Sequence, residues 1–256
     1  MKISKIGWTD FSGSGCPSLN FATGCTPVSA GCAHCYAKAI YQRFGRDFTP
    51  TFHPEKLEAL VRQRFPEYSP KRGAPHKPMA FLCDTGDLFH ETVPMYVQWT
   101  ALNLMVRRQD LAWQVLTKRG RNMAAVVRAY VMGHGKGLMG HGPLPPNIWL
   151  GVSVEDQAIA DERIPLLLDT PAAVRFVSVE PCLSAVDLSP LMPGIDWLVV
   201  GAESGPHRRP FDVAWATALY HQCQDADVPF FGKQASGLRP GEPLIIDGQL
   251  RQEWPL

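Results

Sequence analysis

The sequence contains no run of about 18 apolar residues, the length that a helix needs to cross a bilayer. Residues 1–15 hold no apolar segment of the length found in a signal peptide. Neither sign of charge is in excess, because Lys plus Arg number 25 and Asp plus Glu number 24. We therefore expect a cytoplasmic protein with no membrane partner, in which any contact with nucleic acid comes from a local basic patch.

A disulfide framework is a poor explanation for the cysteines, since seven is an odd number and no secretory signal is present. Reduced thiols fit better, and three of them, Cys25, Cys32 and Cys35, lie close enough in sequence to serve as metal ligands. The other four are mostly expected to be small buried hydrophobic residues, and they are Cys16, Cys83, Cys182 and Cys223.

The composition is that of an ordinary globular protein, with 45% hydrophobic and 19% charged residues in a chain of 256. An α/β barrel commonly uses roughly 200 to 250 residues as one unit, so the length gives no reason to divide the chain. We expect a single domain over residues 1–256, with a cysteine loop at 23–37 and a C-terminal tail from about residue 235 to 256.

Strands and helices are expected to alternate after residue 78. Short apolar runs, mostly continuous as in strands covered on both faces, lie at 79–83, 113–117, 148–152, 174–179, 197–200 and 229–231. Segments with helical spacing of apolar residues separate several of them, at 93–107, 121–132, 160–168 and 211–225. Loops are expected where Pro and Gly cluster, at 69–78, 133–146 and 237–243.

This alternation predicts βαβ units and a parallel sheet. With a further short strand near residues 19–22, six or seven units are expected, which is many for a small open sheet. The fold class is therefore α/β, as a full or partial (β/α) barrel of six or seven parallel strands. An open doubly wound sheet is the structural alternative.

Polar or ionisable residues occur at the end of nearly every expected strand. In a parallel barrel these ends gather on one rim, the face where active sites are built. The simpler explanation is that strands emerge into solvent there. The residues concerned are Asp84, Asp87, Thr117, Lys118, Arg119, Ser153, Glu155, Ser178, Glu180, Glu203, Ser204, Lys233 and Gln234.

The cysteine loop has the spacing C-x6-C-x2-C, with Gly24 and Gly31 each directly before a cysteine. Glycine relaxes the backbone restrictions that a tightly curled loop meets. Structural zinc and iron-sulfur clusters usually take four protein ligands, so a set of three is informative: a 4Fe-4S cluster held by three cysteines leaves one iron open to a small molecule. Two alternatives stay open, which are a zinc site with His34 or Cys16 as fourth ligand, and three structural cysteines without a metal.

The cysteine triad, with Tyr36 following it, resembles that of the radical S-adenosylmethionine superfamily. The usual spacing there is C-x3-C-x2-C, so this loop is three residues longer, and His34 stands in the usual place of the aromatic residue. The chain is more similar to a phage- and prophage-associated family with this long motif, and more distantly to the spore photoproduct lyase branch. That similarity spans roughly residues 6–234, in TGCTPVSAGCAHCYA, DLFH, LTKR, WLGVSVE, FVSVEP, DWLVVGAESG and PFFGKQ.

The resemblance implies a 4Fe-4S cluster on Cys25, Cys32 and Cys35 that binds and cleaves S-adenosylmethionine, giving a 5′-deoxyadenosyl radical that abstracts hydrogen from a substrate. Two strand-end residues also have simpler explanations that involve no cofactor, in which Asp87 caps a turn and Arg119 is an exposed surface residue. For the cofactor, the resemblance implies Asp84 and Asp87 at the methionine ammonium, Lys118 or Arg119 at its carboxylate, Ser153 and Glu155 at the ribose, and Thr117 and Tyr36 nearby. For the substrate side it implies Glu180, Glu203 and Lys233, with Lys118 also catalytic.

The kinship further implies a nucleic-acid base or modified nucleoside as substrate, with an isomerase or lyase reaction such as a rearrangement of hypermodified thymine in phage DNA. An external electron donor is implied, and the host cytoplasm is the location if a phage encodes the protein. Two other functions are a zinc-dependent nucleic-acid-binding protein without catalysis and a structural or redox-sensing iron-sulfur partner protein. Local basic groups that suit phosphates lie at 71–77, 107–108, 118–121 and 207–209.

Overall fold

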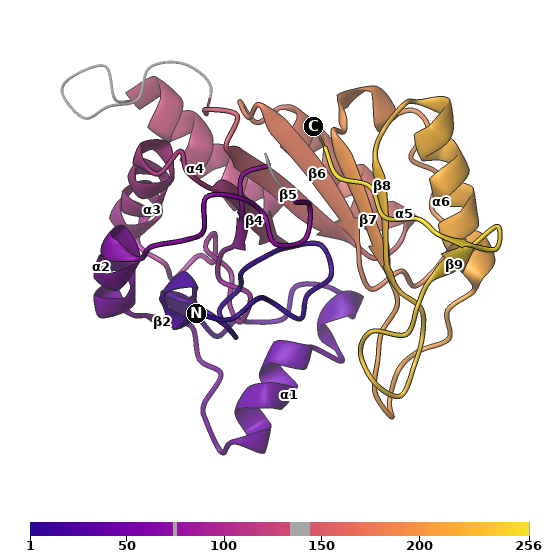
Figure 1. Ribbon diagram of the computed structural model, residues 1–256, viewed down its shortest axis with the longest axis horizontal. Coiled ribbons are helices and arrows are strands. Elements are labelled where there is room, and N and C mark those ends of the chain that lie inside the picture. The colour runs from indigo at the N-terminus through magenta and orange to yellow at the C-terminus, as the bar shows by residue number, and fades with distance from the viewer. Residues whose placement is uncertain (74–75, 134–143, 256) are drawn as a thin grey trace.

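The computed structural model describes residues 1–73, 76–133 and 144–255. Its main element is a sheet of six parallel strands in sequential order, which confirms the α/β fold. Within the described residues the first and last strands are not paired with each other, so the curled sheet is a partial barrel (Figure 1). The strands are β3 (Met79–Phe81), β4 (Ala112–Thr117), β5 (Ile148–Val154), β6 (Val174–Val179), β7 (Trp197–Gly201) and β8 (Phe230–Gln234).

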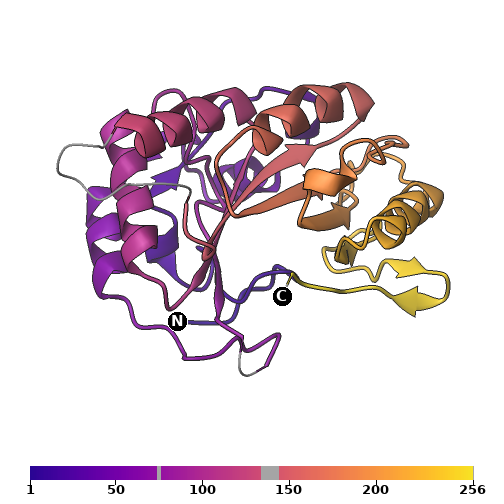
Figure 2. The same ribbon diagram turned by 90° about the horizontal axis from the view of Figure 1, so that it is seen from above.

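The four helices expected from apolar spacing are present and cover the outer side of the sheet, with both chain ends on the inner side (Figure 2). Asp156 and Asp212 cap two of them, each accepting a hydrogen bond of 2.9 Å from a main-chain N–H in the first turn. These helices are α3 (Met95–Arg107), α4 (Gly120–Gly133), α5 (Gln157–Leu168) and α6 (Val213–Asp225). The expected loop at 133–146 lies mostly outside the described residues.

The strand expected near residues 19–22 is not part of this sheet. Residues Pro17–Leu19 form a 3-10 turn, and β1 (Ala22–Thr23) pairs antiparallel with β2 (Thr51–Phe52). The apolar run is still buried, with Leu19 and Phe21 fully enclosed, because it packs in the core without joining the sheet. Its apolar character thus indicated burial and not strand pairing. Elements that the sequence did not indicate are α1 (Tyr36–Arg43), α2 (Pro54–Arg62), β9 (Ile245–Ile246) and β10 (Gln249–Leu250).

Two apolar cores lie on the two faces of the sheet, which explains why the strands read as continuous apolar runs. The outer core joins alternate strand residues to the helices. The inner core is largely aromatic and includes Trp8 of the N-terminal segment, with Trp254 of the C-terminal segment packed against it. Strand residues of the inner core are Met79, Phe81, Ala112, Trp149, Phe176, Trp197, Val199 and Phe231.

Segments near the two chain ends lie along the open edges of the sheet. Phe11 forms a parallel bridge with Ala80 of β3, and Gln252 forms an antiparallel bridge with Phe231 of β8. The indole N–H of Trp197 donates to the main-chain oxygen of Glu253 at 2.9 Å. The concave face is therefore filled at one end and leaves the carboxyl ends of the strands as the rim. In the described ranges there is no helix with the length and apolar character that crossing a bilayer requires.

Candidate active site

Hydrogen bonds with groups that follow four strands hold the cysteine loop, residues 23–37, on the rim of the sheet. The groups after β4, β5 and β7 are side chains, whereas after β3 the main-chain oxygen of Asp84 accepts from Tyr36. The loop therefore lies across the carboxyl ends of the parallel strands, the edge at which barrel enzymes place their sites.

Tyr36 connects the end of the loop to the end of β3. Its ring is half-exposed, but its hydroxyl is turned inward and donates to the main-chain oxygen of Asp84. Burial raises the pKa of Tyr36 well above its usual value. The Asp84 carboxylate faces the N-terminal segment, where Asn20 donates to it at 2.6 Å, and burial raises its pKa despite these hydrogen bonds.

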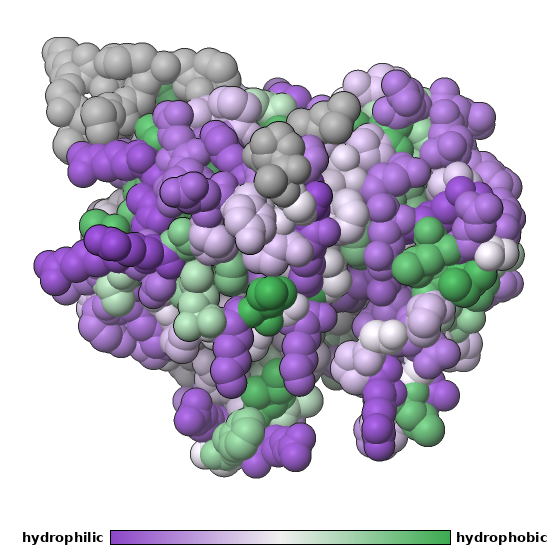
Figure 3. All heavy atoms as spheres, viewed as in Figure 1, coloured by the Kyte–Doolittle hydropathy of each residue, from purple (hydrophilic) through white to green (hydrophobic). Residues whose placement is uncertain are grey.

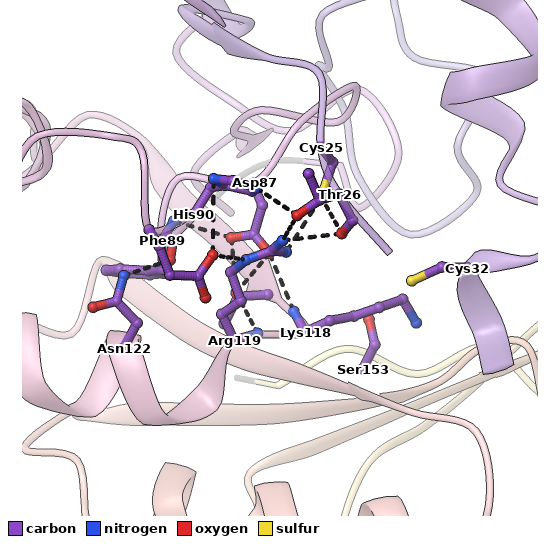
Figure 4. Close-up of polar contacts among 12 residues, drawn as sticks. Cys25, Thr26, Cys32, Asp87, Phe89, His90, Lys118, Arg119, Asn122 and Ser153 are labelled. Carbon is purple, nitrogen blue, oxygen red and sulfur yellow. Dashed lines mark hydrogen bonds and ion pairs between the residues drawn. The ribbon is translucent and has the colours of Figure 1, made fainter. Parts of the chain in front are cut away.

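Arg119, which follows β4, lies between the buried Asp87 and the start of the cysteine loop (Figure 4). Its side chain is 3% exposed. It donates to the Sγ of Cys25 at 3.2 Å and to the main-chain oxygen and hydroxyl of Thr26 at 3.0 and 2.9 Å. Its Nε donates to Glu91 at 2.7 Å. Arg119 is thus a buried link between the sheet and the loop, and not an exposed residue.

Asp87 positions the residues around Arg119. Its carboxylate accepts from the Thr117 hydroxyl at 2.7 and 2.8 Å, from the Phe89 N–H at 2.9 Å, and from Arg119 at 3.3 Å. The Phe89 contact is the turn cap that the sequence allowed for Asp87. Burial raises the pKa of Asp87, although the Thr117 and Arg119 contacts lower it. Both carboxylate oxygens are already occupied by groups of the protein itself.

His90 supports the same part of the loop. Its Nδ1 accepts from the Thr92 N–H at 3.1 Å, so we assign the proton of the neutral ring to Nε2. That N–H donates to the hydroxyl of Thr26 at 2.9 Å. Burial, together with the charge of Arg119, lowers the pKa of His90 and favours the neutral ring. The hydroxyl of Thr26 consequently accepts from two donors, His90 and Arg119.

Glu155, at the end of β5, contacts the middle of the cysteine loop. Its side chain is fully buried and accepts from the Ser29 hydroxyl at 2.9 Å and from the Lys118 ammonium. Arg163 of α5 donates to both of its oxygens at 3.4 Å. A β-carbon on Gly31 would lie 2.5 Å from the Glu155 side chain, so glycine is needed for the loop to approach this closely. Figure 4 shows Lys118 pointing away from Arg119, on the side of Cys32.

Glu203, after β7, holds the loop from the other side. Its carboxylate accepts from the Arg209 N–H at 2.8 Å and shares a 3.0 Å hydrogen bond with Nδ1 of His34. Burial raises the pKa of Glu203, but the hydrogen bonds from Arg209 and His34 outweigh it and bring the value to about 2. Arg209 also donates to the main-chain oxygen of Ala30 at 3.0 Å.

The predicted substrate-side residues Glu180 and Lys233 form an ion pair near β6 and β8, with side chains about one fifth exposed. A β-carbon on Gly201 would lie 3.3 Å from Glu180, which places the pair against the end of β7. Ser153 and Lys233 lie within β5 and β8 because these strands are longer than expected. Ser153 is buried, and its main-chain oxygen accepts from Arg163 at 2.8 Å.

The cysteines differ in burial, and the four that were expected to be buried are buried. Burial raises the pKa of Cys25 to about 11, although Arg119 lowers it. No group of three or more His, Cys, Asp and Glu side chains within residues 1–73, 76–133 and 144–255 is close enough to hold a metal ion. Cys25, Cys32 and Cys35 are partly exposed thiols, whereas Cys16, Cys83, Cys182 and Cys223 are buried.

The donor set nevertheless fits an iron-sulfur cluster in its chemistry. The three exposed thiols share one loop, none is in a disulfide, and a guanidinium donates to one sulfur. Gathering the sulfurs at one centre requires their side chains to turn from the described positions, so this point stays a prediction. The two suggested fourth ligands for zinc have other partners, since His34 contacts Glu203 and Cys16 shares a 3.2 Å hydrogen bond with Ser18.

Among the predicted rim residues, the side chains of Arg119, Glu155 and Glu203 contact the cysteine loop directly. Arg119 and Glu155 do so at Thr26 and Ser29, which the sequence analysis does not select. The hydroxyls of Thr26 and Ser29 were a usable signal, because polar residues between metal-binding cysteines often bind the surrounding protein. The sequence suggests phosphate contacts for the basic group at 207–209. In the structure, Arg209 of this group donates to the main-chain oxygen of Ala30 in the cysteine loop. The basic group at 71–77 is similarly engaged, since Lys71 donates to the main-chain oxygen of Ile6.

Two surface hollows occur elsewhere, and neither is lined by a rim residue. One of about 250 Å³ lies beside Val228 and Trp254, and another of about 330 Å³ lies between α5 and residues 187–191. Neither suits an apolar cofactor or substrate, because both are shallow and partly lined by acidic side chains.

Comparisons with known proteins give one family and one set of solved structures. The family described as "Protein of unknown function (DUF5131)" matches residues 3–244. A structure titled "Spore photoproduct lyase complexed with dinucleoside spore photoproduct" is 10% identical, with a TM-score of 0.45 over 86% of this chain and 75% of that one. A mutant of the lyase with the same dinucleoside is 11% identical, with a TM-score of 0.48 and the same coverage. No curated protein matches the chain in sequence.

Proposed function

We propose that this chain, which belongs to the family described as "Protein of unknown function (DUF5131)", is a radical S-adenosylmethionine enzyme. The observation that carries the proposal is the binding of the three-cysteine loop to the rim, by side chains at the ends of three strands and by the main-chain oxygen of Asp84 after a fourth. Burying a charged side chain is costly in free energy unless the charge is paired. Several buried charged side chains around one short loop therefore indicate that the loop has a function. A 4Fe-4S cluster on Cys25, Cys32 and Cys35 would supply the electron that cleaves S-adenosylmethionine.

The residues of the rim divide into two roles under this proposal. Asp87 and Arg119 position the loop, because their polar atoms are used by the protein itself. Arg119 also donates to the Cys25 sulfur, a contact that favours the thiolate form needed for a ligand. Asp84 holds the N-terminal segment and the main chain beside Tyr36, so we assign it to positioning as well.

The groups left for the cofactor and the substrate lie further round the rim. Lys118 is partly exposed and carries the charge suited to a carboxylate, while Glu155 orients its ammonium. Glu180 and Lys233 are partly exposed as a pair, and each can exchange its partner for a polar group of a substrate. We propose Lys118, Ser153 and Glu155 on the cofactor side, and Glu180 and Lys233 on the substrate side.

The proposed substrate is a nucleic-acid base or a modified nucleoside, with a rearrangement or lyase reaction started by hydrogen abstraction. The sequence motifs shared with the phage-associated family support this class, and hypermodified thymine in phage DNA is the specific candidate. The electron has to come from an external donor, because no second cysteine cluster is evident in the sequence.

Anaerobic reconstitution with iron and sulfide, reduction with dithionite, and assay for 5′-deoxyadenosine test the function. The wild type should bind iron and sulfide and form 5′-deoxyadenosine, and Cys32→Ala should lose the product. Cys223→Ala is the matched control, because Cys223 is a buried thiol of α6 far along the chain from the loop. Product formation by Cys32→Ala at the wild-type rate would overturn the proposal.

The same experiment separates the other two functions. Stoichiometric zinc without sulfide or colour would indicate a zinc-dependent binding protein. Iron and sulfide without cleavage of S-adenosylmethionine would indicate a structural or redox-sensing cluster. Either result would overturn the proposal.

A further inference from the structure

Helix α1 begins directly after Cys35 and projects from the body of the molecule (Figure 1). Ala37 is its single buried residue. An isolated helix shorter than about 12 to 15 residues is marginal in water, so a short helix normally depends on an apolar face that packs against the protein. Almost all of α1 instead faces solvent, which leaves a surface free for a partner.

The exposed side of α1 carries large apolar and aromatic side chains in one stripe. Tyr36, Ile40 and Phe44 are 54%, 44% and 65% exposed. Their spacing of four residues places them on the same side of the helix. At the end of the molecule where α1 lies, Figure 3 shows hydrophobic and hydrophilic residues side by side.

The surface around this stripe is basic. Lys38, Arg43 and Arg46 are exposed, and no ion pair or side-chain hydrogen bond joins them to any residue that the structure describes. The guanidinium of Arg46 lies over the Phe44 ring, 5.9 Å from its centre. The nearby Asp47 is engaged by Thr49, whose hydroxyl donates to it at 2.6 Å. These three cations therefore differ from Arg119, Lys118 and Arg209, which have carboxylate partners within the protein.

We infer that α1 and residues 44–48 bind the single-stranded nucleic acid that carries the target base, and this rests on the proposed function. Exposed aromatic rings between basic side chains are the combination that single strands require, because bases stack on the rings while the cations follow the phosphates. The basic charge also suits an acidic electron-transfer protein. The aromatic stripe favours nucleic acid, since every base offers a flat face for stacking.

Position supports the same conclusion. Cys35 is the N-cap residue of α1, so a strand bound along the helix lies next to the cysteine loop. A nucleotide displaced from that strand would lie beside the cysteine loop, and hence beside the rim to which the loop is bound. The surface thus provides the substrate contact that the internally paired basic residues of the rim do not.

Fluorescence anisotropy of a short labelled single-stranded DNA with the full chain tests the inference. Phe44→Ala should weaken binding about tenfold through the loss of one stacked base. The double variant Arg43→Gln and Arg46→Gln should weaken it and reduce the slope of log affinity against log salt by about 1.4, as expected for two lost phosphate contacts. Val61→Ala and Arg62→Gln change exposed residues of another helix, α2, and should bind as the wild type does.

Two binding results would overturn the inference: no binding of the DNA by the wild type, or equal binding by the wild type and the α1 variants. It would also be overturned if the α1 variants bound DNA normally but were no longer reduced by an acidic electron-transfer protein. The last result would assign the surface to an electron donor. Formation of 5′-deoxyadenosine with dithionite should not depend on Phe44, so its absence from the wild type would count against the function and not against this surface.

Discussion

Replacing Arg119 tests the link between the sheet and the cysteine loop. Arg119→Gln removes the charge opposite Asp87, whose side chain is 6% exposed, and removes the donors to Cys25 and Thr26. Removing one partner of a buried ion pair lowers the free energy of unfolding by about 3 to 5 kcal/mol. Asp87 keeps the hydrogen bonds from Thr117 and from the Phe89 N–H, so we expect the lower end, about 3 kcal/mol of unfolding free energy.

Urea unfolding of Arg119→Gln beside wild type measures this cost. Arg119→Lys should fall between them, because a lysine keeps the charge but cannot reproduce the forked contacts with Thr26 and Cys25. Arg121→Gln is the matched control, since Arg121 is exposed two residues further along the chain. Equal stability of Arg119→Gln and Arg121→Gln would refute the reasoning.

The same variant gives a second readout after reconstitution. Hydrogen bonds to sulfur and nearby positive charge raise the reduction potential of an iron-sulfur cluster. The potential of Arg119→Gln should therefore be lower than that of wild type, as measured by a redox titration followed by electron paramagnetic resonance. An unchanged potential with full iron content would show that Arg119 does not face the cluster.

Two further predictions concern pH and packing. The pKa of Glu203 is lowered from 4.5 to about 2, so its contribution to stability is complete above about pH 4.5 and is lost as the pH falls towards 2. The stability difference between wild type and Glu203→Gln should shrink over that range, and a constant difference would contradict the assignment to Arg209 and His34. Gly151→Ala should cost about 1 to 3 kcal/mol by overpacking, because its β-carbon would lie 2.5 Å from the Phe176 ring. Gly133→Ala has open space and is the control, and equal melting temperatures of the two variants would be the contrary result.

The strands were predictable because both faces of the sheet are covered. All seven residues of β5 are buried, between helices on one side and the aromatic core on the other, so the segment reads as apolar throughout. The run at residues 19–22 is equally apolar, but it is not a strand of the main sheet, because it is buried elsewhere in the core. Continuous apolarity indicates burial, and only pairing partners decide strand membership. Helix α1 gave no signal because it buries a single residue.

The sequence indicated the cysteine loop and part of the rim that contacts it, but not the hydrogen bonds that hold the loop in place. Arg209 and Ala30 are 179 residues apart, and no local pattern reveals that their atoms meet. The same holds for Ser29 and Glu155, which are 126 residues apart. A polar residue at a strand end can face a cofactor or support a loop. Which of the two it does depends on residues that are distant in sequence and become its neighbours only in the folded chain.

The aromatic core inside the curled sheet has a consequence for synthesis on the ribosome. Trp8 leaves the exit tunnel before the strands of the main sheet, whereas Trp254 and the main-chain oxygen of Glu253 that binds Trp197 leave after all of them. Until then the concave side of the later strands is uncovered, and partly folded chains with exposed aromatic surface are prone to aggregate. The inner aromatic core can therefore be completed only after residues 253 and 254 have been synthesised.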